Sequence, residues 1–293
     1  MRQLVKKSVF FIFFWAGYLG VVQAQSQYSF AVKKTGKGAP MIFIPGLYCG
    51  GAIWEETAAA FSDRYTCYMI TLPGFDGQPP VVSDSLLMKV TRELAAFIRD
   101  EKLKQPVVIG HSTGGWLALN LGVSSPELTG DIICVSAAPF MAALSMGMDV
   151  SVDSCRQIGK RIQQYMAAQQ PEQVKSGQQY ILKTMIRDSV YIAKVMDMAL
   201  RSDNRTQAQV MYELFSNDLR PALSAIRSRI LVLGDWYGYR QFGSSRQRVN
   251  ENLESQFRLA RRTTIAISDS SLHFIMYDEP QWLRQQISQF LRR

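Results

Sequence analysis

Short, continuously apolar runs alternate with amphipathic stretches along most of this chain, and that alternation restricts the possible folds more than any other feature. Val107-Val108-Ile109 and Ile230-Leu231-Val232-Leu233 contain no polar residue. A strand that is apolar on both sides must be covered on both faces, which is typical of a parallel sheet between two layers of helices. The sequence therefore predicts a doubly wound α/β domain with a mostly parallel sheet.

The predicted elements follow one another in regular order. The strand candidates are Tyr28–Lys33, Pro40–Ile44, Thr66–Thr71, Pro106–Gly110, Asp131–Ser136, Ile230–Gly234 and Thr263–Ser268. The helix candidates between them are Ala52–Ser62, Ser83–Lys102, Thr113–Val123, Arg246–Ala260 and Asp278–Leu291. The last helix opens with two acidic residues and a proline, a composition that suits a helix start.

One segment interrupts this order. From Phe140 to about Leu219 the pattern is helical only, over Ser154–Gln169, Lys175–Arg201 and Gln207–Phe215. Because the segment lies between two predicted strands, residues 140–219 are expected to form a helical cap over the carboxyl edge of the sheet. Residues 25–139 and 220–293 then form the core domain. The segment is rich in methionine, which suits either a surface that accepts varied apolar groups or plain filling of the core.

The N-terminus has the composition of an export signal. Arg2, Lys6 and Lys7 precede an apolar run from Val9 to Val22, and Val22-Gln23-Ala24 has small residues where a signal peptidase reads. We expect residues 1–24 to be removed and the protein to be periplasmic or secreted. The alternative is a retained N-terminal anchor, although the run is short for a bilayer span of about 20 residues.

The remaining composition bears on partners. The net charge of +9 includes three leader cations, so the mature chain is nearer +6, and its basic residues are dispersed. They predict solvated helix faces rather than a nucleic-acid or anionic-membrane surface. No second apolar stretch is long enough to cross a membrane. The four cysteines, Cys49, Cys67, Cys134 and Cys155, fall on separate predicted elements, so buried thiols are expected in place of disulfides.

Gly110-His111-Ser112-Thr113-Gly114 is the strongest chemical signal. It matches G-x-S-x-G and lies between a predicted strand and a predicted helix, as the mechanism of that motif requires. So sharp a turn raises the serine hydroxyl at the N-terminus of the helix, where the helix dipole favours developing negative charge. The motif predicts that Ser112 is a nucleophile.

A serine hydroxyl needs a base to take its proton, and the chain has two histidines. His111 adjoins the nucleophile but is expected to point elsewhere and to serve packing. His273 lies between the last strand and the last helix, on a loop at the edge where the nucleophile is expected. It is therefore the predicted base. Two distant histidines and dispersed cysteines give no metal-ligand cluster, and no organic cofactor is implied.

Three segments resemble the α/β-hydrolase family. Ile42-Phe43-Ile44-Pro45-Gly46-Leu47 with Trp54 is similar to its oxyanion loop and following helix, and Leu72-Pro73-Gly74-Phe75 to its D-x-P-G-x-G turn. His273-Phe274-Ile275-Met276-Tyr277-Asp278-Glu279-Pro280 resembles the stretch around its catalytic histidine. By this resemblance, the amides of Leu47 and Thr113 form the oxyanion hole. Pro45 stands where many members carry histidine, which need not matter because the donors are main-chain groups.

The acid of the predicted triad departs from the family pattern. The usual position falls on Tyr237, while Asp235 directly follows Gly234 and reaches His273 only if its loop bends inward. Asp235 is the first candidate and Asp203 the second, whereas Asp269 resembles a turn residue. The family's other acid position, at Ser136-Ala137-Ala138, has no carboxylate. A dyad without an acid also stays open.

Together these features predict a serine hydrolase that cleaves a small or medium ester, lactone or thioester with an apolar acyl part. Two alternatives remain. The same residues suit a cofactor-free peroxidase-type enzyme or a C–C bond hydrolase, and proteins of this fold also serve as non-catalytic ligand receptors.

Overall fold

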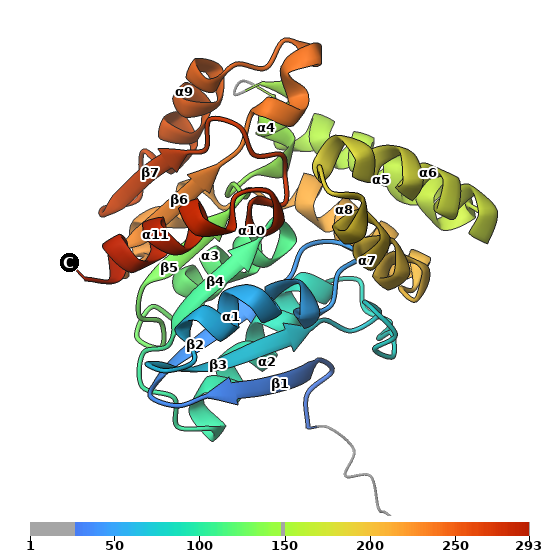
Figure 1. Ribbon diagram of the computed structural model, residues 1–293. Helices are drawn as coiled ribbons and strands as arrows, with labels where there is room; N and C mark the ends of the chain where they lie inside the picture. The colour runs from blue at the N-terminus through green and yellow to red at the C-terminus, as the bar shows by residue number, and fades with distance from the viewer. Residues whose placement is uncertain (1–26, 148–149, 293) are drawn as a thin grey trace, which may run out of the picture.

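The computed structural model describes residues 27–147 and 150–292, which form one seven-stranded sheet between layers of helices (Figure 1). The strand order is β1-β3-β2-β4-β5-β6-β7; β1 pairs antiparallel with β3, and the other neighbours are parallel. The strands are β1 (Ala31–Gly36), β2 (Ala39–Ile44), β3 (Tyr65–Thr71), β4 (Val107–His111), β5 (Ile132–Val135), β6 (Ile230–Gly234) and β7 (Thr263–Ile267). The predicted doubly wound, mostly parallel α/β fold is confirmed.

Successive residues of each central strand enter opposite cores, as the alternation of side chains along a strand requires. In β2, Ile42 and Ile44 pack into one core, and Met41 and Phe43 into the other. β6 divides in the same way. Since both faces are covered, these strands are apolar throughout.

The helices of the two layers divide between these cores. On the Ile42 side lie α2 (Leu86–Asp100), α3 (Thr113–Ser124), η2 (Arg220–Ala225) and α9 (Arg246–Phe257). On the Met41 side lie η1 (Gly51–Trp54), α1 (Glu55–Phe61), α10 (Ile275–Asp278) and α11 (Pro280–Leu291). A further short helix, η3 (Tyr237–Phe242), follows β6.

In the described residues, five α-helices come between β5 and η2, which precedes β6: α4 (Met141–Met146), α5 (Val152–Ala168), α6 (Pro171–Met185), α7 (Ser189–Leu200) and α8 (Asn204–Ser216). This helical segment is hydrogen-bonded to loops that follow the carboxyl ends of two strands. The amide of Asp203 donates to Gly74 O after β3, and the amide of Phe274 after β7 donates to Met185 O. α5 to α8 therefore lie at the carboxyl edge of the sheet, at the right in Figure 1. We call α5–α8 the cap helices.

The prediction of one continuous helix over Lys175–Arg201 was wrong. The chain is extended at Ile186 (φ −141°, ψ 137°), whose side chain is buried, and Asp188 caps the next helix by accepting from Val190 N at 2.8 Å. The aspartate satisfies an amide at the start of α7 that has no helical partner, so the break is stable.

The first strand begins three residues later than predicted. Tyr28 and Phe30 instead form an aromatic cluster with Phe97 of α2, with Tyr28 and Phe30 stacked at 5.3 Å and Phe97 edge-on to both. Aromatic residues favour strands, but here ring packing decides their position.

The four cysteines are free and buried, which confirms the expectation of thiols. None of the helices in the described part of the chain has the length and apolarity needed to cross a bilayer. The predicted leader, residues 1–24, lies outside the described residues, as does Met148 of the methionine-rich segment.

Candidate active site

Ser112 lies at the sharp turn between β4 and α3, in a backbone conformation that side chains rarely adopt (φ 51°, ψ −116°). Its amide donates to Val135 O at 3.0 Å, and its carbonyl accepts from Gly115 N at 2.9 Å. A non-glycine residue with such a φ is strained, and it persists only where its surroundings fix it. Ser112 is 9% exposed.

Two glycines of the motif make this turn possible. A Cβ on Gly110 would lie 2.1 Å from Gly114 O, and one on Gly114 would lie 2.2 Å from Ile44 O. Both distances are far inside van der Waals contact with rigid backbone. The motif therefore needs glycine at these positions because the strand, the turn and the start of α3 are packed backbone to backbone.

The loop after β2 lies directly against the turn. A Cβ on Gly46 would be 3.1 Å from the Cβ of Ser112, so this loop passes beside the serine. Thr113 is the first residue of α3, where an amide has no partner within the helix. Within residues 27–147 and 150–292, neither the Leu47 amide nor the Thr113 amide donates to a backbone carbonyl of a turn or loop, which is compatible with their predicted role as oxyanion donors.

His273 and Asp235 meet at the carboxyl ends of β7 and β6. Gly234 pairs with Ile267, so the two strands deliver their following loops side by side. Nδ1 of His273 is 3.7 Å from Oδ1 of Asp235, and the two side chains are 15% and 6% exposed. The distance is longer than a hydrogen bond, and it is short enough for an ion pair when His273 is protonated. The other carboxylate oxygen, Oδ2, is buried without a hydrogen-bond partner.

The other carboxylates considered for the triad have different contacts. Asp203 caps α8, where Oδ1 accepts from the amide of Thr206 at 2.7 Å and from its hydroxyl at 2.6 Å. Asp269 is 85% exposed and forms an ion pair with Arg246 at 2.8 Å. Of these three aspartates, Asp235 is the one placed beside His273.

His111 has a role beyond the packing expected of it. Its Nε2 lies 3.1 Å from the carbonyl oxygen of His273, and the two imidazole centroids are 4.8 Å apart. A carbonyl oxygen only accepts, so Nε2 carries the proton. Burial is the larger cause that holds the pKa of His111 well below its ordinary value, and the neighbouring His273 lowers this pKa further. His111 is therefore a neutral donor that fixes the backbone of His273.

Two acidic residues hold the loop that carries His273. Oδ2 of Asp278 accepts from Leu272 N at 2.8 Å, and Oδ1 accepts from Arg187 N of the cap at 3.1 Å. Glu279 accepts from the hydroxyls of Ser268, at 2.6 Å, and Ser270. The sequence analysis interprets this acidic pair as a helix start and as part of the stretch that resembles the family's histidine segment, but it does not predict these hydrogen bonds. A signal was present, since the serines before His273 and the acids after it are short polar partners flanking one turn.

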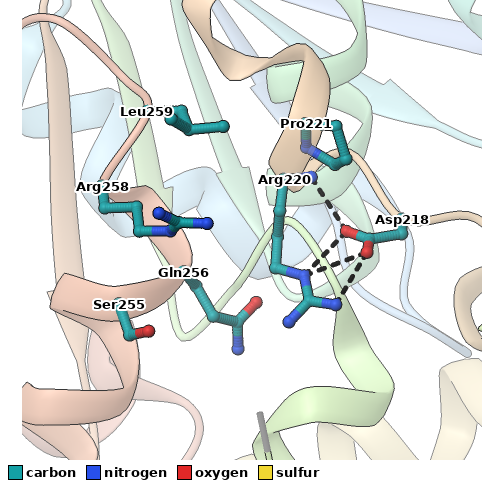
Figure 2. A pocket seen from close by; sticks show the side chains of 7 residues that line it. All are labelled: Asp218, Arg220, Pro221, Ser255, Gln256, Arg258 and Leu259. Atoms are coloured by element: carbon teal, nitrogen blue, oxygen red, sulfur yellow. Dashed lines mark hydrogen bonds and ion pairs between the residues drawn. The ribbon is translucent and has the colours of Figure 1, made fainter. Parts of the chain in front are cut away.

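Elsewhere on the molecule, a cavity of about 620 Å³ lies between η2 and α9 (Figure 2). Arg220 and Asp218 face each other across a bidentate ion pair on one side, and Arg258 projects from the other. None of the predicted catalytic residues lines this cavity. Within residues 27–147 and 150–292, no three histidine, cysteine, aspartate or glutamate side chains group closely enough to hold a metal ion.

Ser112 is strained and lies between a strand and a helix of a mostly parallel sheet. The loops that carry His273 and Asp235 lie at the same edge of that sheet. This arrangement defines a protein with a nucleophile elbow. Residues 41–286 match the α/β-hydrolase family, and the chain belongs to that family.

Two curated relatives match part of the chain. A pimeloyl-[acyl-carrier protein] methyl ester esterase of Aeromonas hydrophila is 32% identical over 117 residues, which span 39% of this chain and 44% of that protein. A dihydrolipoyllysine-residue acetyltransferase component of the acetoin cleaving system of Cupriavidus necator is 28% identical over 131 residues, which span 43% of this chain and 34% of that protein. The chain thus aligns with less than half the length of either relative.

Solved structures match over nearly the whole chain. A thermophilic esterase from Thermogutta terrifontis has a TM-score of 0.73 at 16% identity, covering 90% of this chain and 93% of that one. The enol-lactonase from Burkholderia xenovorans LB400 has a TM-score of 0.72 at 12% identity, covering 90% and 96%. At such low identity these likenesses show the shared fold.

Proposed function

We propose that this protein is a serine hydrolase that cleaves carboxylic esters through an acyl-enzyme intermediate. The observation that carries the proposal is the strained Ser112 at the strand–helix turn, with the Gly46 loop against its Cβ. Strain at a buried turn costs free energy, and an enzyme gains from it because the hydroxyl is presented at the helix N-terminus.

The proposed reaction begins when the Ser112 hydroxyl attacks the acyl carbonyl and His273 takes its proton. The oxyanion of the tetrahedral intermediate accepts hydrogen bonds from the Leu47 and Thr113 amides. His273 then gives the proton to the leaving alcohol as the ester C–O bond breaks. In the second half, His273 takes a proton from water, which attacks the acyl-enzyme, and then returns the proton to Ser112 as the bond to Ser112 breaks and the carboxylic acid leaves. Asp235 stabilises the imidazolium that forms twice in this cycle.

The substrate is proposed to be a small or medium ester, lactone or thioester with an apolar acyl part. The methyl ester esterase among the partial relatives supports an ester. The cap methionines offer weaker support, because Met185, Met196 and Met198 pack into the core beside the sheet. That packing is the core-filling role considered for them from the sequence.

Export is part of the proposal and rests on the leader sequence. Its cationic head, apolar run and Val22-Gln23-Ala24 support cleavage after Ala24. Mass spectrometry of the protein recovered from a host's periplasm or medium should give a chain that starts at Gln25. A chain recovered only in the membrane fraction with Met1 present would favour the retained anchor.

Labelling by a fluorophosphonate tests the chemistry directly. The wild type should be labelled on Ser112 and should hydrolyse p-nitrophenyl butyrate, and Ser112→Ala should do neither. Ser176→Ala, on the exposed side of α6, is the matched control and should behave as wild type. Undiminished labelling of Ser112→Ala would remove this residue from the mechanism. A folded wild type with perhydrolysis or diketone cleavage but no ester turnover would favour the peroxidase-type or C–C hydrolase alternatives.

A further inference from the structure

Tyr48, the residue after the predicted oxyanion donor Leu47, is held by the cap helix α8. Its amide donates to Oε1 of Gln207 at 2.8 Å, and its hydroxyl donates to Oδ1 of Asn204 at 3.0 Å. Gln207 is fully buried and Tyr48 nearly so. A buried amide needs a partner, and for Tyr48 that partner comes from a segment 159 residues further along the chain.

The conformation of Tyr48 makes this hold important. Its φ is 62°, a left-handed value that is costly for an aromatic residue. Such a conformation persists only when its surroundings fix it. Gln207 and Asn204 hold the two ends of the residue, and the hydroxyl of Ser202 lies 3.4 Å from its carbonyl oxygen. Three side chains of the cap thus hold Tyr48, and one of them, Gln207, bonds the peptide unit that follows Leu47.

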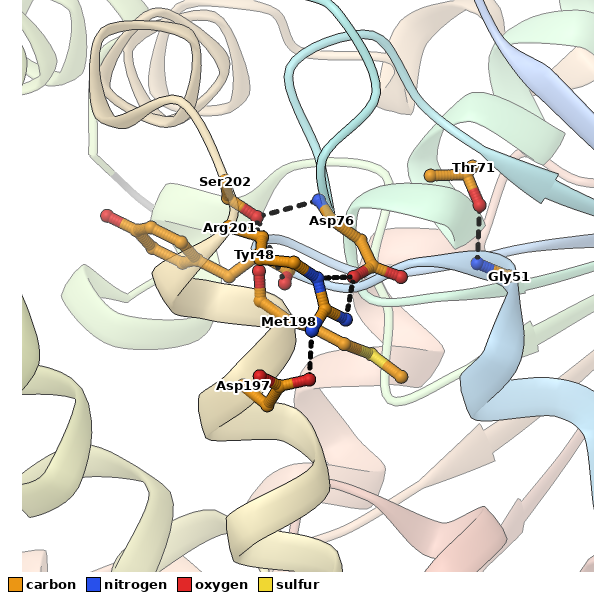
Figure 3. Close-up of polar contacts among 8 residues, drawn as sticks. All are labelled: Tyr48, Gly51, Thr71, Asp76, Asp197, Met198, Arg201 and Ser202. Carbon is orange, nitrogen blue, oxygen red and sulfur yellow. Dashed lines mark hydrogen bonds and ion pairs between the residues drawn. The ribbon is translucent and has the colours of Figure 1, made fainter.

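Gln207 also bridges to a second core loop. Its Nε2 donates to Gly74 O at 3.1 Å, so one amide side chain joins the loops after β2 and β3. The same junction of the cap is anchored beside it: Arg201 forms an ion pair with Asp76, and the amide of Asp76 donates to Ser202 at 2.9 Å (Figure 3). The bridge is therefore attached to a firmly docked part of the cap.

We propose that Gln207 is a positioning residue that sets the oxyanion hole of this enzyme, an inference that rests on the proposed function. By accepting the Tyr48 N–H, Gln207 fixes the plane of the Leu47–Tyr48 peptide and, across the Leu47 Cα, restrains the preceding peptide, which carries the Leu47 N–H. A misdirected donor weakens the transition state more than the ground state, because the oxyanion exists only in the former. The cap thus contributes to catalysis itself as well as covering the site.

Gln207→Leu tests the inference, because it keeps a side chain of comparable bulk and removes both hydrogen bonds. We expect kcat for p-nitrophenyl butyrate to fall roughly 10- to 100-fold, up to what loss of one oxyanion donor causes, with KM within about threefold. The inhibition constant of a trifluoromethyl ketone, which forms a tetrahedral oxyanion on the serine, should rise by the factor by which kcat/KM falls. The final fraction labelled by a fluorophosphonate should equal that of wild type.

Gln209→Leu is the matched control. Gln209 lies on the same helix and donates to Asp84 O and Glu213 Oε1, away from Tyr48. It should lower stability while leaving kcat and the inhibition constant unchanged.

Gln207→Glu covers the case in which the leucine variant does not fold. The introduced carboxyl, when protonated, can accept from Tyr48 and donate to Gly74 as glutamine does, and burial raises its pKa. When ionised it can only accept, so its second oxygen is repelled by Gly74 O and the side chain is displaced from Tyr48. Its activity relative to wild type should therefore rise as the pH falls from about 8 to about 6. A ratio that does not change with pH would contradict the inference.

The outcomes separate the two proposals. Suppose that the wild type is labelled and active. If the kcat of Gln207→Leu is then within about threefold of wild type, or falls no more than that of Gln209→Leu, the positioning role alone is overturned. A wild type that no fluorophosphonate labels overturns the proposed function and this inference with it.

Discussion

The contact between His273 and Asp235 gives the sharpest test of the proposed triad. Asp235→Asn removes a negative charge whose Oδ1 lies 3.7 Å from Nδ1 of His273, and it keeps the shape of the side chain. Both residues are mostly buried, and Oδ2 of Asp235 has no hydrogen-bond partner. The substitution therefore perturbs charge at one position with little change in packing.

The magnitude follows from that distance. When His273 takes the serine proton it becomes cationic, and a carboxylate at 3.7 Å stabilises it by about 4.5 kcal/mol at an effective dielectric constant of about 20. That free energy corresponds to a roughly 2000-fold change in rate. Full screening by water would reduce the interaction to about 1 kcal/mol and the effect to less than about tenfold. Because Asp235 is 6% exposed, we expect kcat/KM to fall about 10³-fold.

The assay is steady-state hydrolysis of p-nitrophenyl butyrate, corrected for active sites by fluorophosphonate titration. Asp203→Asn and Asp269→Asn are the controls: the first keeps a helix-capping side chain, and the second removes an exposed ion pair. Both should stay within about threefold of wild type. Asp235→Asn that keeps more than about a tenth of the wild-type kcat/KM would refute the reasoning, and a comparable loss in Asp203→Asn would move the acid into the cap.

Two further predictions concern the nucleophile turn. His111 is buried with its pKa well below the ordinary 6.5, so the unfolded chain binds a proton that the folded chain does not. The free energy of unfolding is thus unaffected by this histidine above about pH 6.5, and it falls on acidification by up to about 1.4 kcal/mol per pH unit. His111→Gln should flatten urea-derived stability between about pH 7 and pH 5, and equal slopes would contradict this. Gly114→Ala would place a Cβ 2.2 Å from Ile44 O and should cost about 3 kcal/mol or more. Gly177→Ala, with open space around it, should instead stabilise by about 1 kcal/mol; similar urea midpoints for the two would be evidence against the packed turn.

Sequence reasoning reached the fold because it depends on local, periodic signals. β6 was predicted with its observed bounds, because a short run that is apolar at every position suits a strand covered by helices on both faces. The errors fall where tertiary contacts override periodicity. Tyr28 and Phe30 leave the first strand to pack on Phe97, and Ile186 breaks a helix in order to bury its side chain.

For the site, the sequence predicted the residue types but not their contacts. Ser112 stood out because its glycines are demanded by the turn itself. The contact of His111 with the carbonyl of His273 joins residues 162 positions apart, and no local pattern encodes it. The same is true of Gln207, a glutamine on a helix face whose two partners, Tyr48 and Gly74, lie far earlier in the chain.

The two halves of the proposed site are held by different parts of the cap. The end of α6 and the turn after it bond the His273 loop through Met185 O and the Arg187 amide, whereas α8 bonds the oxyanion loop through Gln207. In the proposed mechanism, a change at either of these contacts would therefore shift the base or the oxyanion donor. Since α6 and α8 bond different loops, substitutions at the α6–α7 turn should affect proton transfer, and substitutions at the start of α8 should affect oxyanion binding. In the proposed mechanism, the base and the oxyanion donor would thus be coupled to the cap through identifiable hydrogen bonds.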